Sequence, residues 1–323
     1  MPSLPIPRSL ARPIWLLVTV LVFLFLATVI AARAEDRVVR IGFQKYGTLV
    51  LLKGKGSLEG KLRPLGYRVT WAEFPAGPQL LEALNAGAID FGSTGEAPPI
   101  FAQAAGARLA YVAHEPPAPL GEAILVPKAS PLRSVADLKG KKVALNKGSN
   151  VHYLLVRALE SAGLSYADVT PVFLAPADAR AAFERGSVDA WAIWDPFLAA
   201  AEAGTGARTL ANGVGLVANH QFYLAEKSFA ETHPKAVDAV LQALAEIDSW
   251  AKDNTDAVAA ELSPSVGIPA AILTVALKRQ TYGLKPLDAG TVAEQQRIAD
   301  TFHKLGLLPK PVVISEAVRA GGS

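Results

Sequence analysis

Short apolar runs alternate with stretches of helical periodicity along the chain from Arg37 onward. Short strands separated by amphipathic helices are typical of βα units, in which helical crossovers join parallel strands. The pattern therefore predicts an α/β architecture. In the first half it predicts strands over Val38–Phe43, Arg68–Glu73, Ala88–Gly92 and Arg108–Val112, and helices at Leu49–Leu52, Pro78–Asn85 and Pro98–Ala105.

The chain contains an internal repeat. The stretch Arg40–Lys45 matches Lys142–Lys147, offset by 102 positions, and Leu84–Asp90 matches Phe183–Asp189, offset by 99. The first pair ends a strand and enters a loop, and the second pair leads from a helix through a glycine into a strand. Two halves with the same order of elements predict two lobes of similar fold.

A hinge is predicted between these halves. Strands at Ala123–Pro127 and Gln221–Leu224 flank the second half, and we expect them to mark the crossings between the lobes. The chain beyond them is almost entirely helical and is expected to pack back on the first lobe. The expected domains are a first part of lobe I at 35–122, a hinge strand with lobe II at 123–216, and a return hinge strand with the helical C-terminal part of lobe I at 217–323, with a ligand cleft between the lobes.

Residues 1–34 have the pattern of a secretory signal peptide. Arg8 and Arg12 precede an apolar run from 14 to 30, and small residues follow at Ala32 and Ala34. This order predicts cleavage after Ala34 and export to the periplasm. A retained membrane anchor is the alternative, because the run reaches the lower length limit of a spanning helix. The sequence has no cysteine, which excludes a lipoprotein anchor.

The charge of the chain gives no sign of a nucleic-acid partner. There are 32 Lys and Arg residues against 29 Asp and Glu among the 323 residues, and three of the basic residues lie in the leader. The remainder is therefore balanced and lacks the electrostatic footprint of a nucleic-acid-binding protein. The five histidines are scattered, and no nucleophile elbow or phosphate loop is present. We expect no metal, no cofactor and no catalysis.

Polar segments lead into two predicted helix N-termini. Lys147–Asn150 precedes a helix over Val151–Glu160, and Ser93–Gly95 precedes a helix that has Pro98 near its start. Unpaired N–H groups and the positive end of the helix dipole attract small anions there. Ordinary capping explains either segment alone. One such segment in each half, both at strand carboxyl ends, favours a ligand in the cleft.

Other side chains are expected beside this site. Gln44 ends the first strand and offers an amide donor, and Asn146 is its near equivalent in the second half. Trp191 and Trp194 flank a strand end and are candidates to enclose an apolar ligand tail. Their spacing points them to opposite faces of a strand, so we expect one of them to lie in the core. Asp195 is expected to cap the next helix.

These residues resemble the substrate-binding proteins of aliphatic-sulfonate ABC importers. The resemblance implies a type II periplasmic-binding fold and a monomeric carrier that delivers an aliphatic sulfonate to an ABC permease and its ATPase. Phe43 stands where such proteins often have tyrosine. The motifs that carry the resemblance are Gly42–Lys45, Pro78–Leu84, Asp90–Pro99, Ala144–His152 and Trp194–Phe197.

The resemblance also implies a role for each candidate residue. The expected sulfonate-binding residues are Gln44, Ser93, Thr94, Gly95, Gly148, Ser149 and Asn150, and the expected tail contacts are Trp191, Trp194 and Tyr223. None of the expected donors titrates near neutrality, so binding is expected to be nearly flat from about pH 5 to 8. The alternatives are taurine, nitrate or a pyrimidine thiamine precursor as ligand, a sensing rather than a transport role, and an enzyme on the same bilobed fold.

Overall fold

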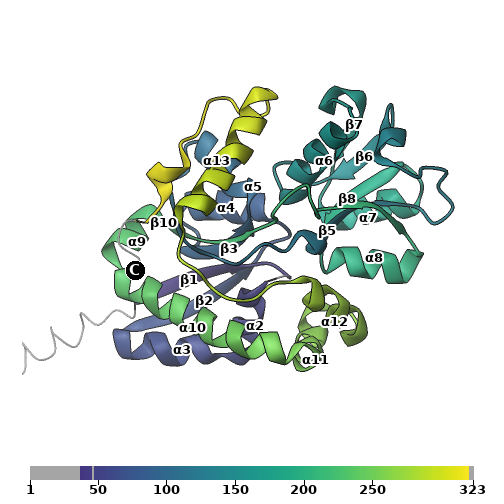
Figure 1. The fold of residues 1–323 in the computed structure, drawn as a ribbon. Helices are drawn as coiled ribbons and strands as arrows, with labels where there is room; N and C mark the ends of the chain where they lie inside the picture. The colour runs from purple at the N-terminus through teal and green to yellow at the C-terminus, as the bar shows by residue number, and fades with distance from the viewer. Residues whose placement is uncertain (1–36, 46, 320–323) are drawn as a thin grey trace, which may run out of the picture.

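Two five-stranded sheets form the framework of the protein, one in each lobe (Figure 1). The computed structural model describes residues 37–45 and 47–319; the expected signal peptide lies outside them. The lobe I sheet has the order β2-β1-β3-β10-β4, and its strands are β1 (Arg37–Phe43), β2 (Tyr67–Glu73), β3 (Phe91–Gly95), β4 (Leu109–His114) and β10 (Gln221–Glu226). The lobe II sheet has the order β7-β6-β8-β5-β9, and its strands are β5 (Glu122–Val126), β6 (Lys142–Leu145), β7 (Thr170–Phe173), β8 (Ala190–Trp194) and β9 (Arg208–Asn212).

The two sheets share one topology. In lobe I, β1 pairs in parallel with β2 and β3, and in lobe II, β6 pairs in parallel with β7 and β8. The fourth strand of each sheet, β10 or β5, is antiparallel to both of its neighbours. Each of these strands enters its sheet directly from a crossing between the lobes. The predicted bilobed α/β fold is therefore confirmed.

Hydrogen bonds confirm the internal repeat at the level of single residues. The Asp90 carboxylate accepts from the Arg40 N–H at 2.8 Å, and the Asp189 carboxylate accepts from the Lys142 N–H at 2.8 Å. The glycine three residues before each aspartate has a φ near +70°, a left-handed turn that glycine adopts without strain. The same turn thus connects helix to strand in both lobes.

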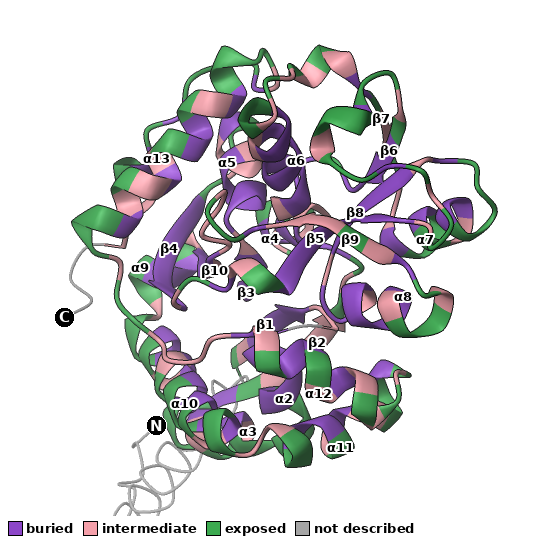
Figure 2. Ribbon diagram, turned by 45° about the vertical axis from the view of Figure 1, so that its right-hand side comes forward, coloured by how far each residue is buried: buried purple, intermediate pink, exposed green. Residues whose placement is uncertain are grey.

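Helices cover both faces of each sheet, and the inner strands are largely buried between them, whereas the edge strands β2, β7 and β9 are partly exposed (Figure 2). Those of the first part of lobe I are α2 (Thr48–Lys55), α3 (Ser57–Leu62), α4 (Gly77–Asn85) and α5 (Ala97–Ala104). Those of lobe II are α6 (Asn150–Ser161), α7 (Pro176–Glu184) and α8 (Phe197–Thr205). The C-terminal helices are α9 (Lys227–Thr232), α10 (Pro234–Asp253), α11 (Thr255–Val266), α12 (Ala270–Arg279) and α13 (Ala289–Lys304).

The C-terminal helices pack against lobe I. Side chains of α10, α11 and α12 share one apolar cluster with β1 and α2, and α13 shares a second with α4 and α5. Among the described residues no single helix is long and apolar enough to cross a membrane, although the bent pair α11 and α12 would be long and apolar enough if taken together.

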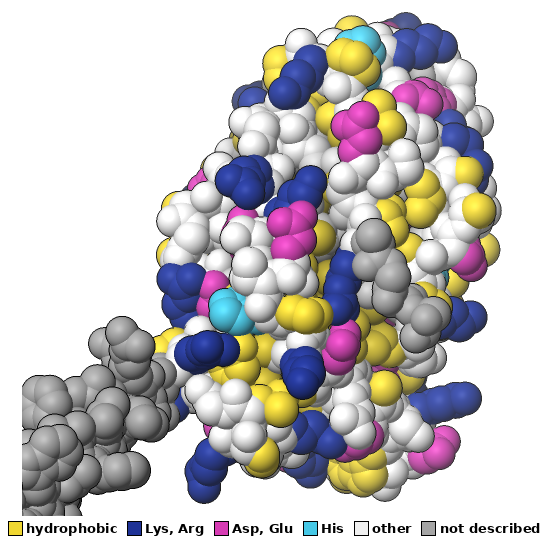
Figure 3. All heavy atoms as spheres, turned by 90° about the vertical axis from the view of Figure 1, so that its left-hand side faces the viewer, with side chains coloured by type: hydrophobic (Ala, Val, Ile, Leu, Met, Phe, Trp, Pro, Cys, Tyr) yellow, Lys and Arg dark blue, Asp and Glu magenta, His cyan; other side chains and the backbone are white. Residues whose placement is uncertain are grey.

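On the face drawn in Figure 3, basic and acidic side chains are interspersed.

The third strand was predicted wrongly. It was expected over Ala88–Gly92, but β3 begins at Phe91. Residues 88–90 form a turn instead, in which the Asp90 carboxylate accepts a hydrogen bond from the Arg40 N–H of β1. Ser93–Gly95 therefore lies inside the strand, paired with β10, and is not the loop that we expected. The segment still ends at the carboxyl edge of the sheet. The short helix α3 was not predicted.

Two segments outside the sheets join the lobes, and the first includes a short 3-10 helix over Pro119–Gly121. The chain leaves lobe I after β4 through residues 115–121 and returns after β9 through residues 213–220. The two strands expected at the crossings, β5 and β10, begin where these segments end. Both crossings run past the carboxyl edges of β3 and β8, and they border the site described next.

Candidate functional site

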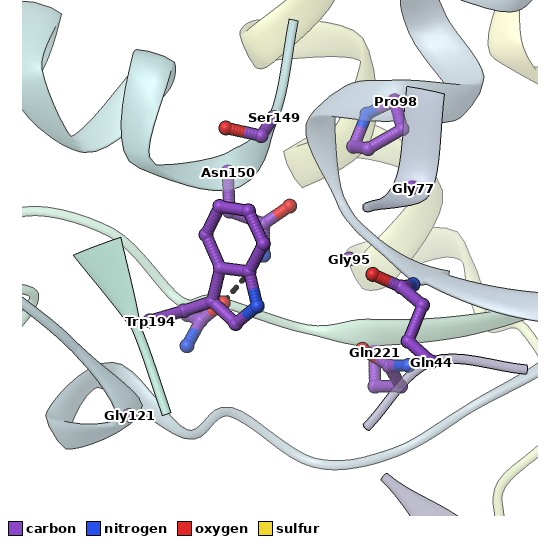
Figure 4. Close-up of a pocket in the computed structure, with 10 residues that line it drawn as sticks. Gln44, Gly77, Gly95, Pro98, Gly121, Ser149, Asn150, Trp194 and Gln221 are labelled. Atoms are coloured by element: carbon purple, nitrogen blue, oxygen red, sulfur yellow. Dashed lines mark hydrogen bonds between the residues drawn. The ribbon is translucent and has the colours of Figure 1, made fainter. Parts of the chain in front are cut away.

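A small cavity lies between the lobes where the two sheets face each other (Figure 4). Its volume is about 40 Å³, and its walls come from both lobes and both crossing segments. The described residues that line it carry no formal charge. They are Gln44, Gly77, Gly95, Pro98, Gly121, Ser149, Asn150, Trp194, Asn219 and Gln221.

The lobe II wall is the N-terminus of α6. Ser149 is the N-cap residue, and its hydroxyl donates to the Asn146 carbonyl at 2.7 Å. Asn150 is the first helical residue and lines the cavity beside Ser149. Gly148 has a φ of +72°, and its Cα faces the Phe101 ring of lobe I so closely that a Cβ would lie 3.3 Å from it. The turn between β6 and α6 is thus packed tightly against lobe I.

His152 fixes this turn from behind. Its Nδ1 accepts from the Gly148 N–H at 3.2 Å, so Nε2 carries the ring proton and donates to the Tyr166 hydroxyl at 2.7 Å. Burial and, to a smaller extent, the positive charge of Lys147 lower the pKa of His152 to about 4. The ring is therefore neutral at physiological pH and serves as a positioning group. The Gly148 N–H is engaged by this bond and is not directed at a ligand.

The lobe I wall is formed by the ends of β1 and β3 and the start of α5. Gln44 follows β1, and its amide donates to the Ser93 carbonyl at 3.1 Å, which holds the side chain at the cavity. Gly95 ends β3, and Pro98 lies in the first turn of α5. The N-termini of α5 and α6 thus meet at one cavity from opposite lobes, and their dipoles favour negative charge between them.

A chain of amide hydrogen bonds crosses the site. Asn150 Oδ1 accepts from the Ala97 N–H at 3.5 Å, and Asn150 Nδ2 donates to Asn219 Oδ1 at 2.5 Å. Asn219 Nδ2 in turn donates to the Ala118 carbonyl at 2.8 Å. One network therefore connects the start of α5, the start of α6 and both crossing segments. Any rotation of the lobes about the crossings must break or rearrange it.

An apolar chamber adjoins the cavity. Its volume is about 210 Å³, and it shares Gln44 and Trp194 with the cavity. Phe74 and Pro75 of lobe I face Pro176 and Phe197 of lobe II across it. Lys45 and Glu73 also border the chamber. Trp194 therefore separates a polar compartment with neutral donors from a mainly apolar one.

The structure brings together only some of the predicted site residues. Gln44, Gly95, Ser149, Asn150 and Trp194 line the cavity, and Gly148 lies behind its lobe II wall. Ser93 and Thr94 are buried in β3, whose Ser93 carbonyl holds Gln44.

Two aromatic residues proposed for the ligand tail do not line either compartment. Trp191 is buried in the lobe II core against Phe183, and it is the one of the two tryptophans that faces inward. Tyr223 is buried in lobe I, where its hydroxyl donates to the Glu115 carboxylate. Asp195 is not the N-cap residue of α8, which is Pro196, but from one residue earlier its carboxylate accepts from the Ala199 N–H at 3.0 Å in the first turn of the helix.

The sequence did not predict several of the residues that line the cavity and the chamber. Asn219 reaches the cavity from the second crossing and Gln221 from the start of β10, and Phe74 reaches the chamber from the end of β2. Asn219 has a φ of +54°, which asparagine tolerates better than most residues, but one asparagine before a strand is too weak a signal to predict that. Among the described residues no group of three or more His, Asp or Glu side chains is placed to hold a metal ion.

Known proteins resemble this chain along most of its length. The family model "NMT1/THI5 like" matches residues 69–257. An aliphatic sulfonates-binding protein of Escherichia coli (strain K12) is 46% identical over 290 residues, which cover 90% of this chain and 91% of that protein. A second aliphatic sulfonates-binding protein, from Bacillus subtilis (strain 168), is 33% identical over 87% of this chain and 85% of its own length.

A solved structure agrees with these relatives. The alkanesulfonate-binding protein SsuA from Xanthomonas axonopodis pv. citri, bound to MOPS, superposes with a TM-score of 0.83 at 44% identity. The match covers 88% of this chain and 99% of that one. The shared fold, the identity and the coverage together show that this chain belongs to the family of aliphatic sulfonate-binding proteins, within the NMT1/THI5-like group.

Proposed function

We propose that this protein is the periplasmic substrate-binding component of an ABC importer and that it captures aliphatic sulfonates by closure of its two lobes. The observation that carries this proposal is the meeting of two helix N-termini at a cavity whose lining residues are all neutral. As a substrate-binding protein, it would deliver its ligand unchanged.

The neutral lining suits a sulfonate head group. A sulfonate is a monoanion at physiological pH with three acceptor oxygens, so amide, hydroxyl and indole N–H donors together with helix dipoles satisfy it without a guanidinium group. Gln44, Asn150 and Trp194 carry such donors from both lobes. The Ser149 hydroxyl, which donates to the Asn146 carbonyl, must turn from that bond to donate to the ligand. One exposed helix dipole contributes only about 0.3–1 kcal/mol, whereas micromolar binding needs about 8 kcal/mol. Donors of both lobes must therefore act together, which requires closure.

The adjoining chamber suits the hydrocarbon tail. A sulfur bound among the cavity residues would direct its carbon chain past Trp194 toward Phe74 and Phe197. Each buried methylene group contributes about 0.8 kcal/mol, so affinity should rise with chain length until the chamber is filled. Nitrate and sulfate, which have no tail, would gain nothing from this compartment.

Opening of the lobes is required for entry. The cavity volume of about 40 Å³ holds little more than water, and the Asn150–Asn219 hydrogen bond lies across it. We infer that the ligand binds an open form and that rotation about residues 115–121 and 213–220 then encloses it. The closed form would be the one that an ABC permease and its ATPase receive.

A ligand panel tests this function. Unfolding midpoints of the mature protein would be measured with linear alkanesulfonates of increasing length, taurine, nitrate and sulfate. MOPS and other sulfonate buffers must be avoided, because a relative has been solved with MOPS bound. We expect the largest shifts with alkanesulfonates. A shift with nitrate or taurine but with no alkanesulfonate would contradict the proposal.

The cellular location is proposed from the leader. Cleavage after Ala34 would release a monomeric carrier into the periplasm, in line with the periplasmic aliphatic sulphonate binding protein SsuA from Escherichia coli, which is 45% identical over 90% of this chain. N-terminal sequencing of the protein from a periplasmic extract should begin at Glu35. A protein that remains in the membrane fraction with its leader intact would instead support the anchor alternative.

A further inference from the structure

Two carboxyl groups are enclosed where the lobes meet. Glu96 follows Gly95 at the end of β3 in lobe I, and Glu122 follows Gly121 at the start of β5 in lobe II. Both glycines line the cavity, so each glutamate directly follows a lining residue in the sequence. The exposed fraction is 1% for Glu96 and 0% for Glu122. Neither side chain lines the cavity itself.

The two side chains lack the partners that buried carboxylates need. Glu96 Oε2 accepts from the His220 N–H at 3.0 Å, but Glu96 Oε1 has no hydrogen-bond partner. Neither oxygen of Glu122 has a hydrogen-bond partner in the part of the chain that the structure describes. Among the described residues, no Lys or Arg forms an ion pair with either group. An ionised carboxylate enclosed without a partner is strongly disfavoured, so this arrangement calls for a proton.

The surrounding charges act in the same direction. Burial raises the pKa of Glu122 well above its ordinary value, and the nearby Glu96 raises it further. The pKa of Glu96 is raised to about 7, mainly by burial and partly by the charge of Glu294 on α13, although backbone hydrogen bonds from His220 and Asn219 lower it. The His220 ring lies 3.2 Å from the Glu294 carboxylate, to which it is hydrogen-bonded.

The remaining neighbours supply no compensating charge to the pair. Tyr153 on α6 interacts with Glu96 and has a raised pKa, so its hydroxyl is neutral at physiological pH. The Gln295 amide on α13 donates to the backbone carbonyl of Glu96 and not to its carboxylate. Arg157 and Arg297, which border the same side of the hinge, pair with Glu160 and Glu294.

An amine on the ligand is a poor alternative to a proton. The unpartnered oxygens are buried, and neither glutamate lines the cavity, although Glu96 borders a second pocket beside Tyr153 and Glu294. A substituted ammonium group on a ligand held in the cavity therefore does not reach them. A proton needs no such room. The bound anion would also lie near both carboxyl groups, and one proton on the pair halves the negative charge that repels it.

We propose that capture of a sulfonate is coupled to uptake of one proton by the Glu96–Glu122 pair, because closure encloses one carboxyl group from each lobe beside the anion. This inference rests on the proposed function. In the open form, water reaches the pair and both groups ionise. In the closed form one proton is held between the lobes, and its release favours opening. The expectation that binding is flat with pH is thereby replaced.

The sign of the coupling follows from linkage. The closed form holds a proton that the open form lacks, so ligand and proton bind cooperatively. Affinity is then highest at low pH and falls as pH rises through the range between the ordinary and the raised pKa of the pair. For one proton the dissociation constant rises by up to about tenfold per pH unit in that range.

Calorimetry in different buffers measures the proton directly. Pentane-1-sulfonate would be titrated into the mature protein at about pH 7.5 in phosphate, imidazole and Tris, which differ in ionisation enthalpy. We expect the observed enthalpy to rise with the buffer's ionisation enthalpy, with a slope near one proton taken up. Glu122→Gln should bind with little loss of affinity, a slope near zero and no pH dependence. The matched control Glu160→Gln, an exposed change on α6, should keep the wild-type slope.

These measurements test proton uptake separately from the identity of the ligand. Enthalpies that are independent of buffer in the wild type would overturn the inference, as would full proton uptake in both Glu122→Gln and Glu96→Gln. If no sulfonate binds at any pH, the proposed function fails, and the proton is then sought in ligand-free protein that adopts the closed form of this structure. There, alkaline pH should lower the unfolding midpoint of the wild type more than that of the glutamine variants. An equal fall in all of them would remove the proton site as well.

Discussion

Gly95 of lobe I and Asn150 of lobe II approach so closely that a Cβ atom on Gly95 would lie 1.9 Å from the Asn150 amide nitrogen. The Asn150 side chain already bonds to Asn219 and to the Ala97 N–H, so it is not free to withdraw. This contact requires a glycine because of the approach itself, since the φ of Gly95 is not in the left-handed region. The lobes can therefore approach this closely only because Gly95 has no Cβ atom.

Gly95→Ala should hold the lobes apart. We expect sulfonate affinity to fall by at least about tenfold, because one extra methylene in a tight contact costs about 1–3 kcal/mol. Gly60→Ala is the matched control, since a Cβ there meets nothing within 4 Å and should stabilise α3 slightly. Isothermal titration of both variants measures the difference. Equal affinities would show that the two residues do not limit closure.

The two tryptophans of β8 should have separable effects. Trp194→Ala should flatten the gain in affinity with chain length, which is about 0.8 kcal/mol per methylene in an apolar pocket, while affecting methanesulfonate least. Trp191→Ala should instead lower the free energy of unfolding by about 3–5 kcal/mol through a core cavity. Urea unfolding and a chain-length series of titrations test the pair. A chain-length slope unchanged in Trp194→Ala would place the tail elsewhere.

Arg279 ties the C-terminal helices to lobe II. Its Nη2 lies 2.6 Å from Glu202 Oε2 and its Nη1 lies 3.5 Å from Asp195 Oδ2, both next to or on α8. Arg279→Gln should therefore weaken sulfonate binding several-fold, since a partly exposed ion pair contributes about 1 kcal/mol or less. Arg319→Gln breaks the Arg319–Asp238 pair within lobe I and should leave affinity unchanged. Equal affinities in the two variants would rule out a role for Arg279 in closure.

His152 should make stability depend on pH on the acid side. Its folded pKa of about 4 is below its ordinary value of 6.5, so its contribution is complete above about pH 6.5 and is lost as pH falls toward 4. The difference in unfolding midpoint between the wild type and His152→Gln should therefore shrink between these values. His303→Gln, at an exposed position, should show no such change. A constant difference for His152→Gln would mean that the ring is not held neutral by the fold.

Local patterns predicted much of the fold for physical reasons. Alternating apolar runs and amphipathic helices are set by residues close together in the sequence, so they can be identified from it. The matched turns at Asp90 and Asp189 likewise lie within short sequence motifs. The start of β3 was predicted too early because Ala88 and Ile89 look like an apolar strand in the sequence. In the structure the Asp90 carboxylate accepts a hydrogen bond from the Arg40 N–H of β1, and the strand begins after it. Here a side-chain hydrogen bond from another strand decided where the strand begins.

The site was less predictable because it is made of tertiary contacts. Ser149 and Asn150 were found because they stand at a helix start, which is a local feature. Asn219, Phe74 and the enclosed pair of Glu96 and Glu122 come together only when two lobes meet. No spacing along the chain records that meeting. Trp191 and Tyr223 are aromatic residues near the site in sequence, but their side chains point into the cores.

Calorimetric titration of a linear alkanesulfonate into the wild type and into Ser149→Asp tests the central claim most directly. The aspartate would place a negative charge at the start of α6, where Ser149 lines the cavity. The account predicts binding at about micromolar dissociation constant or tighter in the wild type and none in the folded variant. Equal affinity in the two proteins would contradict the assignment of the anion to this cavity, and no binding to the wild type would contradict the function itself.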